Sequence, residues 1–326
     1  SEAERRQAKH DIQHVEDIVI EMLRNARDAG ADKVYLATTK EDGVRTLVFL
    51  DNGSGVPQDM QERIFDARVT SKLESMKMDR WGVHGRGMAL FSIKQNTDEA
   101  RVVTSDVDLG SVFKVSVATD RLGERADQSS WPQAVKDEDG HYVCARGPHN
   151  IIRAACEFAL EELRACDVYL GSPSEIAATL HAQASSRLDA SRLLFIDDEA
   201  ELPVVDRLGL ASDAEDFIRI CSGLGLEMSE RTAHRILAGQ IKPVRGVTAR
   251  LLRERDSSSH ASAPVDLAKD RRGLRIAKDD MAQFSRAVER DFNDLASRYY
   301  LNLCGDPKIR VSRDRITVTF DLAKEE

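Results

Sequence analysis

Three polar side chains near the N-terminus have a spacing that could support chemistry. Glu21, Asn25 and Asp28 lie in the segment "VIEMLRNARDAGADKV" (19–34). At 100° per residue in an α-helix, they fall within about 60° of arc beside an apolar face. A carboxylate and a carboxamide one turn apart can act on one water molecule and one metal ion. A solvated helix face tolerates the same residues, so the rest of the chain has to distinguish the two interpretations.

Two glycine-rich segments downstream suit a nucleotide. "DNGSGV" (51–56) follows a predicted strand, where Asp51 can accept a hydrogen bond from an exocyclic amine. Gly53 and Gly55 would let the backbone approach a flat ring. "GVHGRGMA" (82–89) runs into a short apolar helix, and its free backbone N–H groups suit a phosphate.

Each of these motifs is weak when it is taken alone. "DNGSG" lacks the later acidic ligands of a calcium loop. The glycine-rich turn at 82–89 does not lie between consecutive strands of a parallel unit, as a Rossmann fingerprint would. A Gly-Ser pair at 110–111 opens a further predicted strand. The four pieces together, in this order and on suitable elements, favour a binding site.

The elements that must position these residues follow from periodicity and turn signals. Helix, two strands, glycine-rich loop, helix and two strands succeed one another, which predicts an α+β fold with helices on one face of a mixed, mostly antiparallel sheet. A polar loop, a helix, a short strand and a helix-rich block follow, and then a long helix with a hairpin. The expected helices are 10–30, 87–93 and 151–166; the strands are 33–38, 45–50, 101–105, 111–117 and 167–170; the loop is 121–149; the final hairpin uses "KIRV" and "RITVTFDL".

Composition limits the classes of protein that fit. The 326 residues are 41% hydrophobic and 32% charged with a net charge of −9, so the chain is not a polycation that coats nucleic acid. Its five cysteines are scattered, which predicts reduced thiols and a cytoplasmic protein. No apolar run approaches the roughly 18 residues of a membrane span, and we expect no signal peptide and no membrane partner.

The four motifs resemble the ATP-binding domain of the GHKL superfamily, which includes gyrase, Hsp90, histidine kinases and MutL. The resemblance covers about residues 10–118, with "ExxxNAxDA", "DNGSG", "GVHGRG" and Gly-Ser in place of the usual Gly-Thr. Residues 67–93 are similar to the lid of MutL. The resemblance implies a Bergerat fold (a two-layer α/β sandwich), with ATP and Mg²⁺ as the cofactors.

The resemblance also implies roles for individual residues. Glu21 would be the catalytic base, Asn25 would coordinate Mg²⁺ and Asp51 would bind the adenine amine. Asp28 would support the fold around them. Lys72 could reach a phosphate or could equally be a solvated lysine of the lid. The expected nucleotide-binding residues are Asn25, Asp28, Asp51, Gly53, Gly55, Val56, Lys72, Gly82, Gly85, Arg86, Gly87, Met88 and Ser111.

A second resemblance lies in the helix-rich block. "DFIRICSGLGLEMSERTAHRILAG" (216–239) is similar to the helix–two-turn–helix segment of the topoisomerase VI B subunit, although a plain helical hairpin fits equally well. Residues 229–255 hold seven arginines and lysines against two glutamates, which suits either DNA phosphates or an acidic partner. The candidate DNA contacts are Arg231, Arg235, Lys242, Arg245 and Arg250.

These features predict a cytoplasmic GHKL-type ATPase close to MutL and topoisomerase VI B, nucleoid-associated if it binds DNA. ATP would close the lid and join two copies into a homodimer, and a separate nuclease or topoisomerase subunit would act on DNA. The alternative is a nucleotide-gated interaction or signalling module, including a protein-serine kinase of the anti-sigma type, that does not bind DNA. The expected divisions are 1–120 (ATP-binding domain), 121–204 (connecting α/β region), 205–255 (helical), 256–266 (linker) and 267–326 (long helix plus hairpin).

Overall fold

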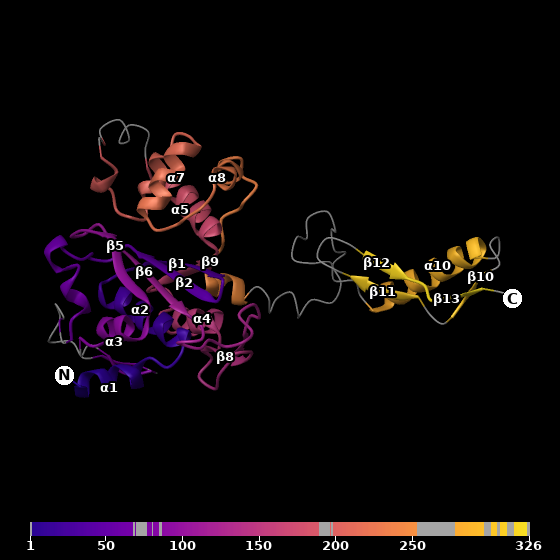
Figure 1. Cartoon of the computed structure of the whole chain (residues 1–326), viewed down its shortest axis with the longest axis horizontal. Coiled ribbons are helices and arrows are strands. Elements are labelled where there is room, and N and C mark those ends of the chain that lie inside the picture. Colours follow the sequence, from indigo (N-terminus) through magenta and orange to yellow (C-terminus); the bar gives the residue numbers. More distant parts are fainter. Residues whose placement is uncertain are drawn as a thin grey trace. The chain divides into compact units, whose positions relative to one another are not determined.

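The computed structural model describes two compact units, an N-terminal unit (Ser1–Ser258) and a C-terminal unit (Ser259–Glu326) (Figure 1). The linker expected at 256–266 lies outside the described residues. The described residues are 2–67, 69, 77–79, 81–84, 87–188, 196, 198–252, 278–296, 301–304, 307–311 and 316–324.

The N-terminal unit is built on a five-stranded sheet with the strand order β5-β6-β2-β1-β9. Neighbours are antiparallel except β1 and β9, so the predicted mixed, mostly antiparallel sheet is confirmed. The turn between β1 and β2 has positive φ at both Asp42 (48°) and Gly43 (79°), as a tight two-residue hairpin turn requires. The strands are β1 (Lys33–Glu41), β2 (Val44–Asp51), β5 (Glu99–Ser105), β6 (Ser111–Ala118) and β9 (Asp167–Gly171).

Strand β9 lies beyond the expected boundary of the ATP-binding domain at residue 120. It pairs in parallel with β1 from Lys33↔Asp167 to Ala37↔Gly171. The sheet therefore draws one edge strand from the region that the sequence interpretation assigned to a connection. The division into domains stays a prediction, but residues 167–171 belong to the sheet that carries the motifs.

Helices pack against both faces of this sheet (Figure 1). Alternate strand residues face opposite sides, so Leu36 and Phe49 join the core under one set of helices, while Tyr35 and Val48 join the core under the other. The predicted helical face is formed by the helices up to residue 161, whereas the helices from residue 173 on cover the other face. One face packs against α2 (Val15–Asp28), α3 (Ala89–Asn96) and α4 (Ile151–Glu161); the other packs against α5 (Pro173–Arg187), α7 (Ala214–Gly223) and α8 (Glu230–Leu237).

The helix expected over 10–30 is two helices, α1 (Glu2–Asp11) and α2. The break has a local cause, because the Asp17 carboxylate accepts hydrogen bonds from the backbone N–H groups of Gln13 and His14, both at 2.8 Å. These bonds satisfy free amides at the start of α2. Helix α1 then packs against α3 rather than extending α2.

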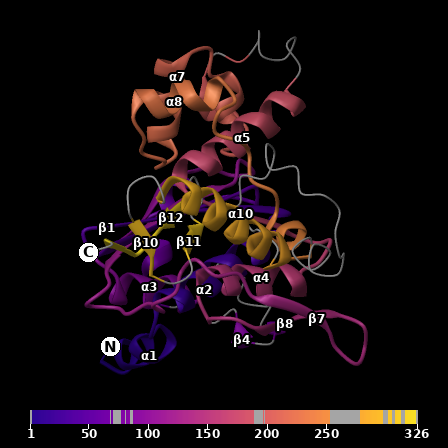
Figure 2. The same cartoon turned by 90° about the vertical axis from the view of Figure 1, so that its right-hand side faces the viewer.

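The sequence interpretation expected a loop over residues 121–149, but the region also contains two strands. Strands β7 (Gln133–Lys136) and β8 (Tyr142–Arg146) form a hairpin beside α4 (Figure 2). Most of their side chains are exposed or half-buried, so the sequence lacks the apolar alternation that would reveal strands. The remaining short elements of the unit are β3 (Lys77–Asp79), β4 (Gly82–His84) and the 3₁₀ turns η1 (Gln58–Met60), η2 (Arg63–Phe65), η3 (Glu199–Glu201) and η4 (Arg207–Leu210).

The C-terminal unit contains the predicted long helix and hairpin. Helix α10 (Lys278–Ala296) is followed by the antiparallel pair β11 (Lys308–Val311) and β12 (Ile316–Thr319), which confirms the hairpin. The rings of Phe292 on α10 and Phe320 after β12 stack with their centroids 3.9 Å apart, so the helix contacts the strand region there. A second pair, β10 (Leu301–Leu303) with β13 (Leu322–Lys324), was not expected. Among the described residues, no helix is long and apolar enough to cross a membrane.

Candidate functional site

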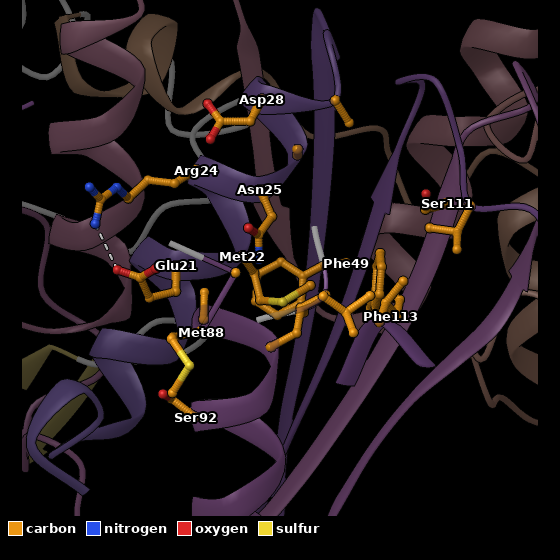
Figure 3. A pocket seen from close by; sticks show the side chains of 18 of the residues that line it. Glu21, Met22, Arg24, Asn25, Asp28, Phe49, Met88, Ser92, Ser111 and Phe113 are labelled. Carbon is orange, nitrogen blue, oxygen red and sulfur yellow. Dashed lines mark hydrogen bonds and ion pairs between the residues drawn. The ribbon is translucent and has the colours of Figure 1, made fainter. Parts of the chain in front are cut away.

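The N-terminal unit contains a cavity of about 480 Å³ that gathers the predicted site residues (Figure 3). This volume lies within the usual range for small-molecule pockets. Helices α1, α2 and α3 contribute to its walls together with the ends of β2 and β6. The predicted residues that line it are Glu21, Asn25, Asp28, Asp51, Gly55, Val56, Gly87, Met88 and Ser111.

Asp51 places a carboxylate at the end of β2. Its side chain is almost fully buried, and its Oδ1 accepts a hydrogen bond from the Gly53 N–H at 2.8 Å. Burial raises the pKa of Asp51 to about 7, although the Gly53 bond favours the charged form. A buried carboxylate with one backbone partner retains acceptor capacity for a ligand amine.

The loop after Asp51 needs glycine at two positions. A Cβ on Gly53 would lie 2.9 Å from the Cβ and the carbonyl oxygen of Ala29. Gly55 has φ +71°, and a Cβ there would overlap the carbonyl of Asp106. The motif therefore reflects close packing of this loop against two neighbouring segments.

Ser105 supports two segments of the site, and the sequence interpretation missed it. Its hydroxyl donates to the Gly110 carbonyl at 2.8 Å and accepts from the Val56 N–H at 2.7 Å. It also lies 3.2 Å from the Ser111 hydroxyl. Ser105 thus joins the loop at 51–56 to the Gly-Ser pair, a link that pairs residues far apart in sequence and has no local signal.

Helix α2 turns its polar face into the cavity, as predicted. Glu21, Asn25 and Asp28 all line it, whereas Ile18, Val19 and Leu23 are buried in the core and do not. The Asn25 side-chain nitrogen is buried and has no hydrogen-bond partner among the described residues. An orphaned amide that lines a cavity fits a site for a polar ligand or a hydrated ion, since such groups are normally satisfied.

An ion-pair network that the sequence interpretation did not identify connects α2 to Asp79 of β3. Arg24 donates to Glu21 at 2.7 Å and to Asp79 at 2.9 Å. Arg27 donates to the same Asp79 oxygen at 3.1 Å and to Asp28 at 3.1 Å. Burial alone would lower the pKa of Arg27, but its bonds to Asp28, Asp79 and Glu162 raise it above the usual value.

Helix α1 also contributes to the cavity, which was not expected. Gln7, His10 and Asp11 line it, and the Asp11 carboxylate accepts a hydrogen bond from Ser92 of α3 at 3.2 Å. The sequence interpretation missed them because it placed His10 and Asp11 at the start of one continuous helix and Gln7 before it. Once α1 folds back on α3, they come within reach of the nucleotide motifs.

The predicted lid is only partly described. Gly82 lies in β4, and Gly87 and Met88 line the cavity. Lys72, Gly85 and Arg86 lie outside the described residues. Trp81 lines the cavity and stacks on Phe158 of α4, with ring centroids 6.3 Å apart.

Comparison with known proteins agrees with this geometry. The family model of the histidine kinase-, DNA gyrase B- and HSP90-like ATPases matches residues 12–128, which contain all four motifs. Residues 12–128 thus match the GHKL ATPase family, and we call this region the GHKL domain.

The GHKL domain is similar to the DNA mismatch repair protein MutL of several bacteria. MutL of Thermodesulfovibrio yellowstonii is 32% identical over 104 residues, which are 31% of this chain and 19% of that protein. MutL of Pediococcus pentosaceus is 30% identical over 121 residues, 36% of this chain and 18% of that protein. MutL of Staphylococcus aureus is 28% identical over 122 residues, 34% of this chain and 18% of that protein. The chain thus matches less than a fifth of the length of these relatives.

The candidate DNA contacts lie outside the cavity of the GHKL domain. Arg231 and Arg235 on α8, with Lys242 and Arg245 after it, are exposed. Arg250 differs, because it donates to the Leu170 carbonyl at 2.9 Å and its guanidinium lies 4.1 Å from the Trp131 ring centroid. Arg250 therefore has a structural role that the expectation of a DNA contact did not foresee.

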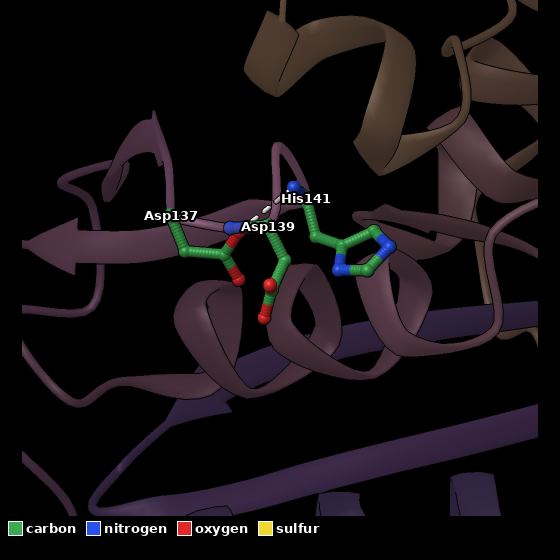
Figure 4. Close-up of side chains that lie close together, drawn as sticks. All are labelled: Asp137, Asp139 and His141. Carbon is green, nitrogen blue, oxygen red and sulfur yellow. Dashed lines mark hydrogen bonds between the residues drawn. The ribbon is translucent and has the colours of Figure 1, made fainter.

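A group of possible metal ligands occurs in the β7–β8 turn, away from the motifs of the GHKL domain. Ligand atoms of Asp137, Asp139 and His141 lie within 4.8 Å of one another (Figure 4). The Asp137 carboxylate accepts the backbone N–H groups of Asp139 (3.1 Å) and His141 (2.8 Å), which is ordinary turn geometry. All three residues are exposed, and we assign no metal to them.

Proposed function

We propose that the GHKL domain binds ATP with Mg²⁺ in the cavity and hydrolyses it, with Glu21 as the general base. The observation that carries this proposal is the convergence of Asp51, Asn25 and Glu21 on one cavity, although Asp51 lies on another element. Their chemistry matches three needs of the reaction: an acceptor for the adenine amine, an amide for the metal and a carboxylate for water.

The arrangement supports a defined orientation of the nucleotide. Adenine would lie against Asp51 and the Gly53–Gly55 loop, which the two glycines allow to pack closely on Ala29 and Asp106. The phosphates would lie toward Asn25 and the start of α3 at Met88. Glu21, one turn before Asn25, would then accept a proton from the attacking water.

Asn25 is the residue that would hold Mg²⁺, together with phosphate oxygens. Its side-chain nitrogen is buried without a partner among the described residues, and a flip of the amide would present the oxygen to a cation at that place. When bound, Mg²⁺ would neutralise charge on the phosphates.

We further propose that ATP closes the lid, joins two copies and couples turnover to DNA, with a separate nuclease or topoisomerase subunit. The support is the exposed cluster of Arg231, Arg235, Lys242 and Arg245 in a chain of net charge −9. The similarity to mismatch repair proteins agrees with a role on DNA. On this proposal the protein acts in the cytoplasm, at the nucleoid when DNA is bound.

Steady-state ATP hydrolysis tests the proposal directly. Turnover is measured with Mg²⁺ or EDTA, with and without supercoiled plasmid, and with Glu21→Ala as the blank. We expect Mg²⁺-dependent turnover that the blank lacks and that plasmid stimulates. Turnover that ignores plasmid would instead favour the nucleotide-gated interaction or signalling module. Turnover equal in wild type and Glu21→Ala would refute the assignment of the base.

A further inference from the structure

Glu21 is linked to the carboxylate of Asp79 through Arg24, which lies one turn after Glu21 on α2. Arg24 is 3% exposed, and its Nη1 donates to Glu21 Oε1 at 2.7 Å (Figure 3). Its Nε donates to Asp79 Oδ2 at 2.9 Å. One buried guanidinium therefore contacts both the proposed base on α2 and a side chain of β3.

Asp79 is held firmly in this position. Arg27 donates to the same Oδ2 at 3.1 Å, and the Trp81 N–H donates to Oδ1 at 3.0 Å. The Asp79 side chain is 6% exposed, and a buried carboxylate persists only when it is paired and hydrogen-bonded. Arg27 in turn contacts Asp28 and Glu162, so the network extends to the C-terminal end of α4.

We propose that Asp79 is a positioning residue for hydrolysis, which acts through Arg24 to hold the Glu21 carboxylate in the cavity. This inference rests on the proposed role of Glu21. Asp79 belongs to the β3–β4 pair, between the two glycine-rich segments of the GHKL domain. Docking of that pair on α2 brings Asp79 to Arg24, so the orientation of the base depends on whether this segment is in place.

The geometry separates this role from nucleotide binding. Glu21 and Arg24 line the described part of the cavity, and Asp79 is not among its lining residues. Neutralising Asp79 removes one of the anions that orient Arg24, so the guanidinium and, through it, the Glu21 carboxylate are held less firmly. Loss of a partner that orients a reacting group lowers turnover more than affinity, because the bound state does not depend on it.

The test measures kcat and affinity for a non-hydrolysable ATP analogue in Asp79→Asn, Arg24→Gln and the double variant. We expect Asp79→Asn to lower kcat by about 10- to 100-fold and to change analogue affinity by less than about twofold. The double variant should be no slower than Arg24→Gln, because residues that act through one another are not additive. Asp66→Asn, the same charge change at an exposed residue, is the matched control and should keep the wild-type kcat.

Analogue binding also reports whether each variant is folded. If Asp79→Asn does not fold, Arg27→Gln removes one cation from the same carboxylate and should lower kcat by a smaller factor at unchanged affinity. A wild-type kcat in Asp79→Asn, or losses that multiply in the double variant, would overturn the proposal.

A second measurement separates this proposal from the proposed function. A thermal-unfolding cycle between Asp79→Asn and Glu21→Gln measures their linkage without any turnover. We expect coupling that disappears in the Arg24→Gln background, and no coupling would overturn the linkage. Absence of Glu21-dependent ATP hydrolysis in wild type would instead refute the proposed function.

Discussion

Asp51 and Ser111 pair with each other across β2 and β6, and each is at least 96% buried. The pair lies where the two strands end at the cavity, beside Ser105. Burying a carboxylate in a sheet without a cation costs stability unless a ligand or bond compensates. This burial supports the proposal that this end of the sheet binds a ligand that donates a hydrogen bond.

Replacing Asp51 with Asn should weaken nucleotide binding while preserving the fold. The amide keeps the shape but loses the charged acceptor, so we expect at least about a tenfold loss of affinity, typical for a charged hydrogen bond. Calorimetric titration with a non-hydrolysable ATP analogue measures it. Asp59→Asn, at an exposed position, should bind like wild type; equal affinities for all three proteins would exclude contact between Asp51 and the ligand.

The same residue predicts a pH dependence of stability. The pKa of Asp51 is about 7 in the folded state against an ordinary 3.8, so the folded state binds its proton more tightly. This contribution to stability is fully present below pH 3.8 and is lost as the pH rises through 7. Wild type should therefore lose on the order of 4 kcal/mol relative to Asp51→Asn between about pH 4 and 8. Denaturant unfolding across this range checks the difference, and parallel curves would contradict it.

Glu21→Ala should abolish turnover and leave ATP binding intact. On the proposed orientation of the nucleotide, the carboxylate would face the phosphates and the attacking water rather than the adenine, which would lie at Asp51. Removal of a general base lowers the rate by about 10²- to 10⁴-fold. A coupled assay for kcat beside analogue titration separates the two effects, and a parallel loss of affinity would assign Glu21 to binding instead.

Gly55→Ala should damage the site more than Gly43→Ala. Both glycines have positive φ, which costs a side chain about 1–2 kcal/mol. Only Gly55 also faces a backbone carbonyl, that of Asp106, whereas a Cβ on Gly43 meets nothing within 4 Å. Thermal melts should show a larger loss for Gly55→Ala, with weaker analogue binding. Equal melting temperatures would show that the loop can move away from Asp106.

The basic residues should divide into two groups. The double variant Arg231→Glu, Arg235→Glu should lower DNA affinity without changing the free energy of unfolding. The slope of log affinity against log salt should fall by about 1 for each phosphate that is no longer neutralised. Arg250→Ala should instead destabilise the fold by about 1–2 kcal/mol, because it removes the interactions with the Leu170 carbonyl and the Trp131 ring, with the DNA slope unchanged. Fluorescence titration at several salt concentrations, beside denaturant unfolding, makes the comparison.

Local patterns were sufficient to locate the polar face of α2, the strands β1, β2, β5 and β6, and the glycine loop after Asp51. Each of these depends on side chains within one or two turns or along one strand, where helical and strand periods are visible directly. The orientation of Glu21, Asn25 and Asp28 toward one cavity follows from the same periodicity, because the opposite face of α2 is apolar and must be buried.

Contacts between distant segments had no such signal. Asp79 meets Arg24 and Arg27, β9 pairs with β1, Ser105 bridges two loops, and α1 folds back over the cavity. Each depends on how separate elements pack, and many alternative pairings satisfy the same local periods. The residues of the site could therefore be named from spacing and resemblance, whereas the network that positions the proposed base became visible only when β3 was placed against α2.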